Sequence, residues 1–431
     1  MNKTLLTGGQ IVSADGLKKA DVLINVDGVI EHVGTVKDHR NADVIDCKGK
    51  LLFPLLIDCH VHFREPGLEH KATMQSESAA ALAAGIGCVC EMPNTIPPTV
   101  TVAALADKVR RAEEVDGVVL RFYFGVTEEA HLHALRELWT GSSMELKRLK
   151  HHCSGLKLYL DHSTGNQKVD GGIVDEIFAT CAELKIPLVA HCEDSDMNAA
   201  AKAANSGGDI AFHSLHRPPE SEAKSIGEAI ARVRKHGTAL HIAHLSTAAG
   251  IDLVRKAKAE KLPVTCEVSP HHLFLSTDDY ASLGTFGKMN PPLRSPADRN
   301  ALWIGIKDGT VDCVATDHAP HTLDEKKSGE PLSAPSGVPG VETMLPLLLT
   351  EAAKKDGRIA YSDIVRLCLV NPNRIFHLAQ HGIEEKTSAR IAIVDPHASG
   401  KIEAKMLKGK SGWTPFEEWP MTGKIERVIA H

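Results

Sequence analysis

The chain has 431 residues, of which 43% are hydrophobic and 24% charged, and its formal net charge is −6. This composition is typical of a globular protein, and the scattered basic residues exclude the electrostatic footprint of a protein that binds nucleic acid or an anionic membrane. We expect a cytoplasmic protein, because no apolar run approaches the roughly 20 residues that cross a bilayer, the first residues do not resemble a secretory signal, and the ten cysteines follow no disulfide or CxxC zinc pattern.

The two ends of the chain have the pattern of short β-strands. Asp-Gly pairs at 15–16 and 27–28 are typical hairpin turns. The stretches "ARIAIVDP" and "GKIERVIAH" near the other end are similarly rich in β-branched residues. Because chain ends often lie close together, we predict that residues 1–52 and 385–431 form one small β-rich module beside a main domain over 53–384.

The main domain alternates short apolar runs with amphipathic helical segments. Most of the runs are rich in Val, Ile and Leu, as strands buried on both faces must be. Repeated strand–helix alternation predicts an α/β fold, a (β/α)8 barrel, rather than a doubly wound sheet. The eight runs lie at 55–62, 86–92, 118–126, 155–160, 186–191, 239–244, 262–268 and 311–316.

Four of the runs end in groups that can bind metals. In a barrel of this kind, the carboxyl ends of the strands line the active site. A single histidine there is more often a hydrogen-bonded structural residue, but five such groups together favour a divalent metal site, and two ions become plausible. The groups are His60 and His62 on the first run, His191 on the fifth, His244 on the sixth and Asp317 after the eighth.

Lys157, in "GLKLYL" of the fourth run, has two interpretations. From spacing alone it is a solvated lysine on an edge strand. Its ammonium would be repelled by divalent ions, but a carbamate formed with CO₂ is an anion whose two oxygens could bridge them.

Segments along almost the whole chain together resemble the dihydroorotases of the amidohydrolase superfamily. The Asp-x-His-x-His of the first run, the lysine, the two later histidines and the last aspartate match the superfamily. The closer match rests on "HVHFREPG", "EMPNT", "GLKLYL", "VAHCED", "VTCEVSPHHLFL", "KMNPPLR", "ATDHAPH" and "GVPGVETMLPLLL".

The resemblance implies a binuclear metal centre with two divalent ions, for which zinc is the expected metal. One ion would be bound by His60, His62 and Asp317, and the other by His191 and His244. Carboxylated Lys157 would bridge them.

The resemblance also implies a set of substrate-binding residues. Arg64 and Asn94 would hold a substrate carboxylate, helped by His321, because a guanidinium recognises a carboxylate through two parallel hydrogen bonds. Asn290 and the backbone near Ser336 and Gly337 would contact the pyrimidine ring. Ser163 or Thr164 could donate to the substrate from a closing loop, although an ordinary loop is an equally good interpretation.

The implied activity is the reversible cyclisation of N-carbamoyl-L-aspartate to (S)-dihydroorotate and water, in pyrimidine (UMP) synthesis. A metal-bridged hydroxide would attack the ring amide, with Asp317 as general acid and base. Allantoinases and hydantoinases or dihydropyrimidinases are the alternatives, and they typically lack the Arg64 and Asn94 pair. A non-catalytic structural homologue is a further alternative, and a homodimer is expected by analogy.

Overall fold

The structure, a computed structural model, describes residues 2–37, 41–161, 167–327 and 329–431. The predicted loop contacts Ser163 and Thr164 therefore lie outside the described residues.

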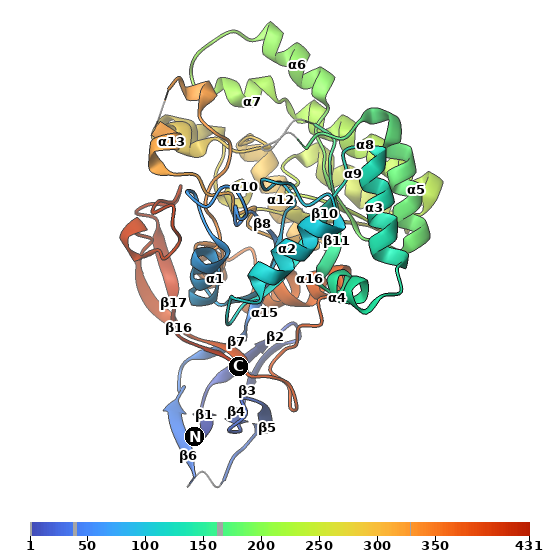
Figure 1. The fold of residues 1–431 in the computed structure, drawn as a ribbon. Helices are drawn as coiled ribbons and strands as arrows, with labels where there is room; N and C mark the ends of the chain where they lie inside the picture. Colours follow the sequence, from blue (N-terminus) through green and yellow to red (C-terminus); the bar gives the residue numbers. More distant parts are fainter. Residues whose placement is uncertain (1, 38–40, 162–166, 328) are drawn as a thin grey trace.

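A parallel eight-stranded sheet forms the centre of the molecule (Figure 1). The two outer strands approach each other through a backbone bridge between Val61 and His318, so the sheet is nearly closed. The predicted (β/α)8 barrel is confirmed. Its strands, in sheet order, are β15 (Cys313–Val314), β14 (Val264–Val268), β13 (Leu240–Ile242), β12 (Leu188–His191), β11 (Cys153–Tyr159), β10 (Val119–Gly125), β9 (Ile86–Glu91) and β8 (Leu56–Val61).

The barrel strands are buried along nearly their whole length. Every residue of β8 and of β9 is buried, because the barrel interior covers one face and the surrounding helices cover the other. The polar groups that end these strands are therefore held in a packed interior rather than on the surface.

Helices surround the barrel. Thr101, Thr247 and Ser295 each accept a hydrogen bond from a backbone amide in the first turn of the helix that follows, which fixes where the helix begins. Their bounds are α1 (Met74–Ala83), α2 (Val102–Ala112), α3 (Glu129–Thr140), α4 (Met144–His152), α5 (Val174–Leu184), α6 (Ser195–Ala204), α7 (Phe212–His216), α8 (Pro219–His236), α9 (Ala248–Ala259), α10 (Pro270–Phe274), α11 (Tyr280–Leu283), α12 (Pro296–Lys307), α13 (Leu323–Lys327), α14 (Met344–Ala352), α15 (Tyr361–Val365) and α16 (Asn371–Phe376). In the described part of the chain, no helix is long and apolar enough to cross a membrane.

Two small sheets lie at one end of the barrel, and both chain termini lie among them (Figure 1). One has the order β5-β4-β1-β6 and comes from the first part of the chain, and the other, β17-β16-β7-β2-β3, joins the two ends of the chain. The strands are β1 (Lys3–Thr7), β2 (Gln10–Ser13), β3 (Gly16–Lys19), β4 (Asp21–Ile24), β5 (Ile30–Gly34), β6 (Ala42–Asp46), β7 (Leu51–Pro54), β16 (Arg390–Lys401) and β17 (Pro420–Ala430).

The apolar run that leads to His60 passes from one sheet to another. Its first part, β7, pairs with β16 and β2, and its second part, β8, begins the barrel. Between them, the backbone amide of Leu55 donates to the carbonyl of Arg390 at 2.9 Å. The predicted domain boundary after residue 52 thus falls inside β7, and the division into two domains stays a prediction.

Candidate active site

Three of the predicted metal ligands converge where β8 and β15 end. His60 Nε2 lies 3.3 Å, and His62 Nε2 3.0 Å, from Oδ1 of Asp317. All three side chains are buried, and their ligand atoms lie within 4.8 Å of one another. Burial alone would raise the pKa of Asp317, but the two imidazoles outweigh it and hold that pKa well below its usual range. The group is therefore an ionised carboxylate between two imidazoles.

His191 and His244 form a second pair beside this group. Nδ1 of His191 lies 3.0 Å from Nε2 of His244, and the ring centroids of His60 and His244 are 5.2 Å apart. Nε2 of His191 lies 2.9 Å from a carboxylate oxygen of Glu193. Burial, reinforced by His191, lowers the pKa of His244, so that imidazole is neutral and able to bind a cation.

Lys157 lies inside the barrel rather than at a sheet edge. β11 is paired on both sides, with β10 and β12, and the lysine side chain is 1% exposed. The interpretation as a solvated edge-strand lysine is therefore wrong. The spacing within one run does not show which strands pair with it, and here β10 and β12 flank β11 on both sides. Within the described residues Nζ has no hydrogen-bond partner, it lies 5.0 Å from the centre of the Tyr159 ring, and burial lowers its pKa to about 8.

Glu267 on β14 contacts two of the predicted metal-binding residues, His60 and His244. Its carboxylate contacts Nδ1 of His60 and accepts from the backbone amide of His244 at 3.2 Å. The same carboxylate lies 3.2 Å from Nε2 of His241 and accepts from the thiol of Cys59 at 3.4 Å. A carboxylate that contacts one ring nitrogen of a histidine determines which nitrogen is left to face a metal, so Glu267 is a candidate orienting residue that the strand-end pattern did not identify.

Cys59, His241 and Cys313 form another buried group whose donor atoms lie within 4.8 Å of one another. Glu267 already bonds to Cys59 and lies within hydrogen-bonding distance of His241, and Nδ1 of His241 lies 2.8 Å from the hydroxyl of Thr265. These side chains therefore belong to the hydrogen-bonded interior below the candidate site.

The predicted carboxylate-binding residues lie beside the donors. Arg64 is 2% exposed, donates from Nε to the carbonyl of Pro320 at 3.1 Å, and places Nη2 3.2 Å from Nε2 of His321. Burial lowers the pKa of Arg64 to about 10, which leaves the guanidinium charged at neutral pH. Oδ1 of Asn94 accepts from Nδ1 of His62 at 2.7 Å, so Asn94 also turns the other nitrogen of His62 toward Asp317.

A small cavity joins these groups. It is lined by His60 near the end of β8 and His62 just after it, by Tyr159 and His244, and by six other predicted site residues together with Ala319. His321 lies behind Arg64, and His191 and Lys157 lie behind the lining residues. The remaining lining residues are Arg64, Asn94, Asn290, Asp317, Ala319, Ser336 and Gly337.

The backbone is left-handed at three predicted site residues. Arg64, His244 and Asp317 have φ values of +66°, +33° and +48°. Non-glycine residues adopt such angles rarely and at a cost, and they do so most often where a side chain must be aimed at a functional site. At Arg64, His244 and Asp317, the chain turns just after a barrel strand has ended.

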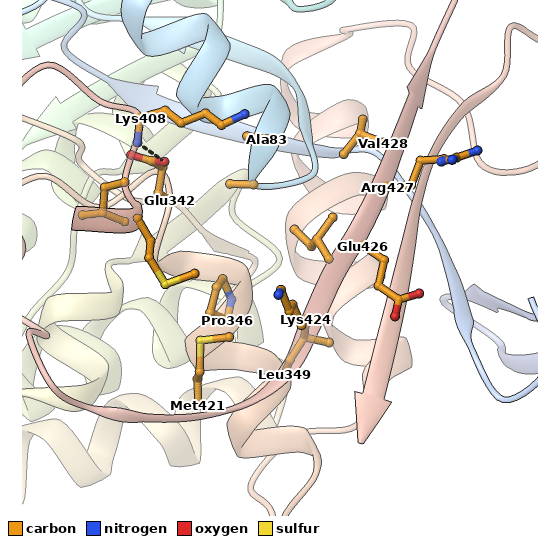
Figure 2. A pocket seen from close by; sticks show the side chains of 15 residues that line it. Ala83, Glu342, Pro346, Leu349, Lys408, Met421, Lys424, Glu426, Arg427 and Val428 are labelled. Carbon is orange, nitrogen blue, oxygen red and sulfur yellow. Dashed lines mark hydrogen bonds between the residues drawn. The ribbon is translucent and has the colours of Figure 1, made fainter. Parts of the chain in front are cut away.

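A second hollow is lined by a different set of residues. Figure 2 shows it between β17, the end of α1 and α14, where the carboxylate of Glu342 accepts from the backbone amide of Lys408 at 2.7 Å. None of its described lining residues is a predicted site residue.

Comparison with known proteins gives consistent results. The amidohydrolase family model matches residues 51–430. A dihydroorotase of Methanosarcina mazei is 39% identical over 94% of this chain and 88% of its own length, and a dihydroorotase of Brevibacillus brevis is 36% identical over 97% and 96%.

Solved structures show the same fold. The L-hydantoinase (dihydropyrimidinase) of Arthrobacter aurescens superposes with a TM-score of 0.91 at 27% identity, over 100% of this chain and 95% of its own. A D-hydantoinase (dihydropyrimidinase) from Thermus sp. gives a TM-score of 0.87 at 25% identity, over 99% and 94%.

Proposed function

We propose that this chain, which belongs to the amidohydrolase family, is a dihydroorotase that interconverts N-carbamoyl-L-aspartate and (S)-dihydroorotate plus water in pyrimidine synthesis. The observation that carries the assignment is the buried guanidinium of Arg64, which lines one cavity with Asn94 and the histidine and aspartate donors. The ring of dihydroorotate bears a carboxylate, and a guanidinium fixed beside the donors is the group suited to bind it. The 33–39% identity to proteins named dihydroorotase supports this assignment.

The donor set fits divalent ions. Two donors on one tetrahedral zinc lie roughly 3.3 Å apart, since Zn–N and Zn–O bonds are about 2.0–2.1 Å long. The corresponding separations here are 3.3 Å for His60 and Asp317, 3.0 Å for His62 and Asp317, and 3.0 Å for His191 and His244.

On this proposal, His60, His62 and Asp317 hold one ion, and His191 and His244 hold the other. Carboxylation of Lys157 would replace a buried amine that has no hydrogen-bond partner within the described residues by an anion whose oxygens would be ligands for both ions. When bound, such ions lower the pKa of a shared water and polarise an amide carbonyl.

Asp317 moves the proton. Its low pKa keeps it ionised at neutral pH, so it can accept a proton from the attacking water and pass it to the departing ring nitrogen. In the biosynthetic direction the same carboxyl group returns the proton. The contacts to His60 and His62 hold its oxygen in place for this transfer.

The chain's own residues orient the substrate. Arg64 and Asn94 bind the carboxylate, with His321 behind the guanidinium. Burial, together with the positive charges of Arg64 and Lys71, strongly lowers the pKa of His321, so this imidazole is neutral. Asn290, Ser336 and Gly337 also line the cavity, where they contact the ring on this proposal.

A hydantoinase is the second candidate, favoured by the names of the solved structures with the same fold. Assays of the metal-loaded protein with dihydroorotate, hydantoin, dihydrouracil and allantoin distinguish a dihydroorotase from a hydantoinase. We expect turnover of dihydroorotate at least about a hundredfold above the others, because the ring carboxylate binds Arg64. Preference for hydantoin would reject the assignment, and no turnover of any of the four would favour the non-catalytic homologue. The homodimer, the cytoplasmic location and the domain division stay predictions.

A further inference from the structure

Lys326 is a lysine buried beside the candidate active site with no assigned role. It lies on α13, its side chain is 0% exposed, and its Nζ lies 5.5 Å from the centre of the Trp413 ring. Burying an ammonium is costly unless acceptors surround it, and burial lowers the pKa of Lys326 to about 7. Within the described residues, its hydrogen-bond acceptors are all backbone carbonyls.

Those carbonyls belong to two segments that line the cavity from different parts of the chain. Nζ donates to the carbonyl of Lys288 at 3.1 Å, two residues before Asn290. It also donates to Pro335 at 3.0 Å and Gly337 at 3.1 Å, on either side of Ser336. One ammonium therefore ties the Asn290 segment to the Ser336–Gly337 segment.

Lys288 completes the connection in the opposite direction. Its Nζ donates to the carbonyls of Leu332 at 2.5 Å and Ala334 at 2.6 Å, and its own carbonyl accepts from the backbone amide of Gly337 at 3.0 Å. The side chains of Lys288 and Lys326 thus donate hydrogen bonds to four backbone carbonyls of one segment, those of Leu332, Ala334, Pro335 and Gly337.

Gly337 shows how closely this segment is packed. Its φ is +139°, and a Cβ there would meet the carbonyl oxygen of Ala319 at 2.6 Å. The backbone amide of Ala319 donates to the carbonyl of Val338 at 2.9 Å. The segment is therefore fastened to the chain just after Asp317 on one side and to the two lysines on the other.

We propose that Lys288 and Lys326 form a two-lysine clamp that positions Asn290, Ser336 and Gly337 for binding of the substrate ring. The clamp rests on the proposed function, because the ring contacts belong to that function. Neither lysine touches the reacting atoms, so both are positioning residues. Since the ring contacts exist before and during the reaction, loss of the clamp removes binding that is equal in both states and raises KM more than it lowers kcat.

The test compares Lys326→Met with Lys327→Met, an exposed neighbour of the same type. In the metal-loaded protein, we expect Lys326→Met to raise KM for dihydroorotate at least about tenfold with kcat within about threefold of the wild type. Lys327→Met should leave both constants unchanged. Lys288→Met should shift KM in the same direction, and it keeps the test usable if Lys326→Met folds poorly.

A second readout does not depend on turnover. The amide of Gly337 should exchange with solvent at least about tenfold faster in Lys326→Met than in Lys327→Met, because its acceptor, the carbonyl of Lys288, loses its anchor. Unchanged exchange, or a KM equal to that of the control, would overturn the clamp. If the wild type does not convert dihydroorotate, the proposed function is overturned. Faster exchange of the Gly337 amide in Lys326→Met would even then support the clamp as a link between the two segments.

Discussion

His191 and His244 are 53 residues apart in sequence, yet Nδ1 of one lies 3.0 Å from Nε2 of the other inside the barrel. His191 ends β12 and His244 follows β13, and these neighbouring strands pair in parallel. Two imidazole nitrogens that face each other at this distance are suited to share a cation that lies between them.

We therefore expect His244→Ala to lose about one metal ion per chain and nearly all activity. Metal content measured by inductively coupled plasma mass spectrometry, beside turnover of dihydroorotate, checks this. His133→Ala is the matched control, because its side chain is 74% exposed on a helix. A chelator should abolish wild-type activity, and added zinc should restore it. Unchanged metal content in His244→Ala would contradict the second ion site.

Asp317→Asn should lower kcat by about 10²–10⁴-fold, the usual contribution of a positioned general base. The amide oxygen still occupies the position 3.0 Å from His62, so the metal content should stay near that of the wild type. Asp324→Asn, at an exposed carboxylate on α13, is the control. If kcat survives while the ions are retained, Asp317 serves as a ligand alone.

Arg64→Lys should raise KM for both dihydroorotate and N-carbamoyl-L-aspartate by about 10–100-fold. A lysine ammonium cannot make the two parallel hydrogen bonds of a guanidinium, and it cannot keep the contact with the carbonyl of Pro320 in the same geometry. Steady-state kinetics in both directions measure the effect. Arg110→Lys, with a side chain that is 58% exposed, is the control, and an unchanged KM would sink the carboxylate assignment.

Lys157→Ala should lose both metal and activity, because it removes the proposed anionic bridge. Short carboxylic acids such as propionate should restore part of the activity by occupying the vacated space near the donors. Lys147→Ala, on an exposed face of α4, should behave like the wild type. A carbamate signal in carbon-13 spectra after exposure to labelled CO₂ is expected for the wild type, and its absence in an active, metal-loaded sample would exclude carboxylation.

Glu351 should make folding stability depend on acid pH. Its carboxylate accepts from Arg358 Nε and Lys354 Nζ, both at 2.6 Å, and is 2% exposed. Burial would raise its pKa, but these hydrogen bonds, Arg358 first, outweigh burial and lower the pKa to about 2 from 4.5. Because the folded-state pKa is the lower one, the stabilisation is complete above about pH 4.5 and is lost as pH falls toward 2.

Glu351→Gln should therefore lower the free energy of unfolding by about 1–3 kcal/mol at pH 7, and the difference from wild type should shrink as the pH approaches 3. Urea unfolding of wild type and variant at pH 7, 5 and 3 measures the difference in the free energy of unfolding and its change with pH. The exposed Glu137→Gln is the control. A difference that stays constant across this range would show that the ionised carboxylate is not its source.

Local pattern was enough to predict the barrel and the strand ends. Apolar runs rich in Val, Ile and Leu alternated with helical segments, and the strand period of two puts His60 and His62 on one face, whereas Arg64 lies beyond the end of β8 with a left-handed backbone. The barrel is confirmed by the eight-stranded parallel sheet. The roles of the site residues stay predictions, although the structure brings His60, His62, His244 and Asp317 to one cavity.

Sequence by itself thus determined the fold class and which polar groups end the buried strands, since both follow from periodicity along one element. Tertiary structure alone decided what each group faces. It buried Lys157 between two partner strands, put Glu267 behind His60 and joined Lys326 to Lys288 and Gly337. These relationships depend on contacts between residues distant in the chain or on irregular backbone. Burial and hydrogen-bond partners there are set by packing, which no local pattern records.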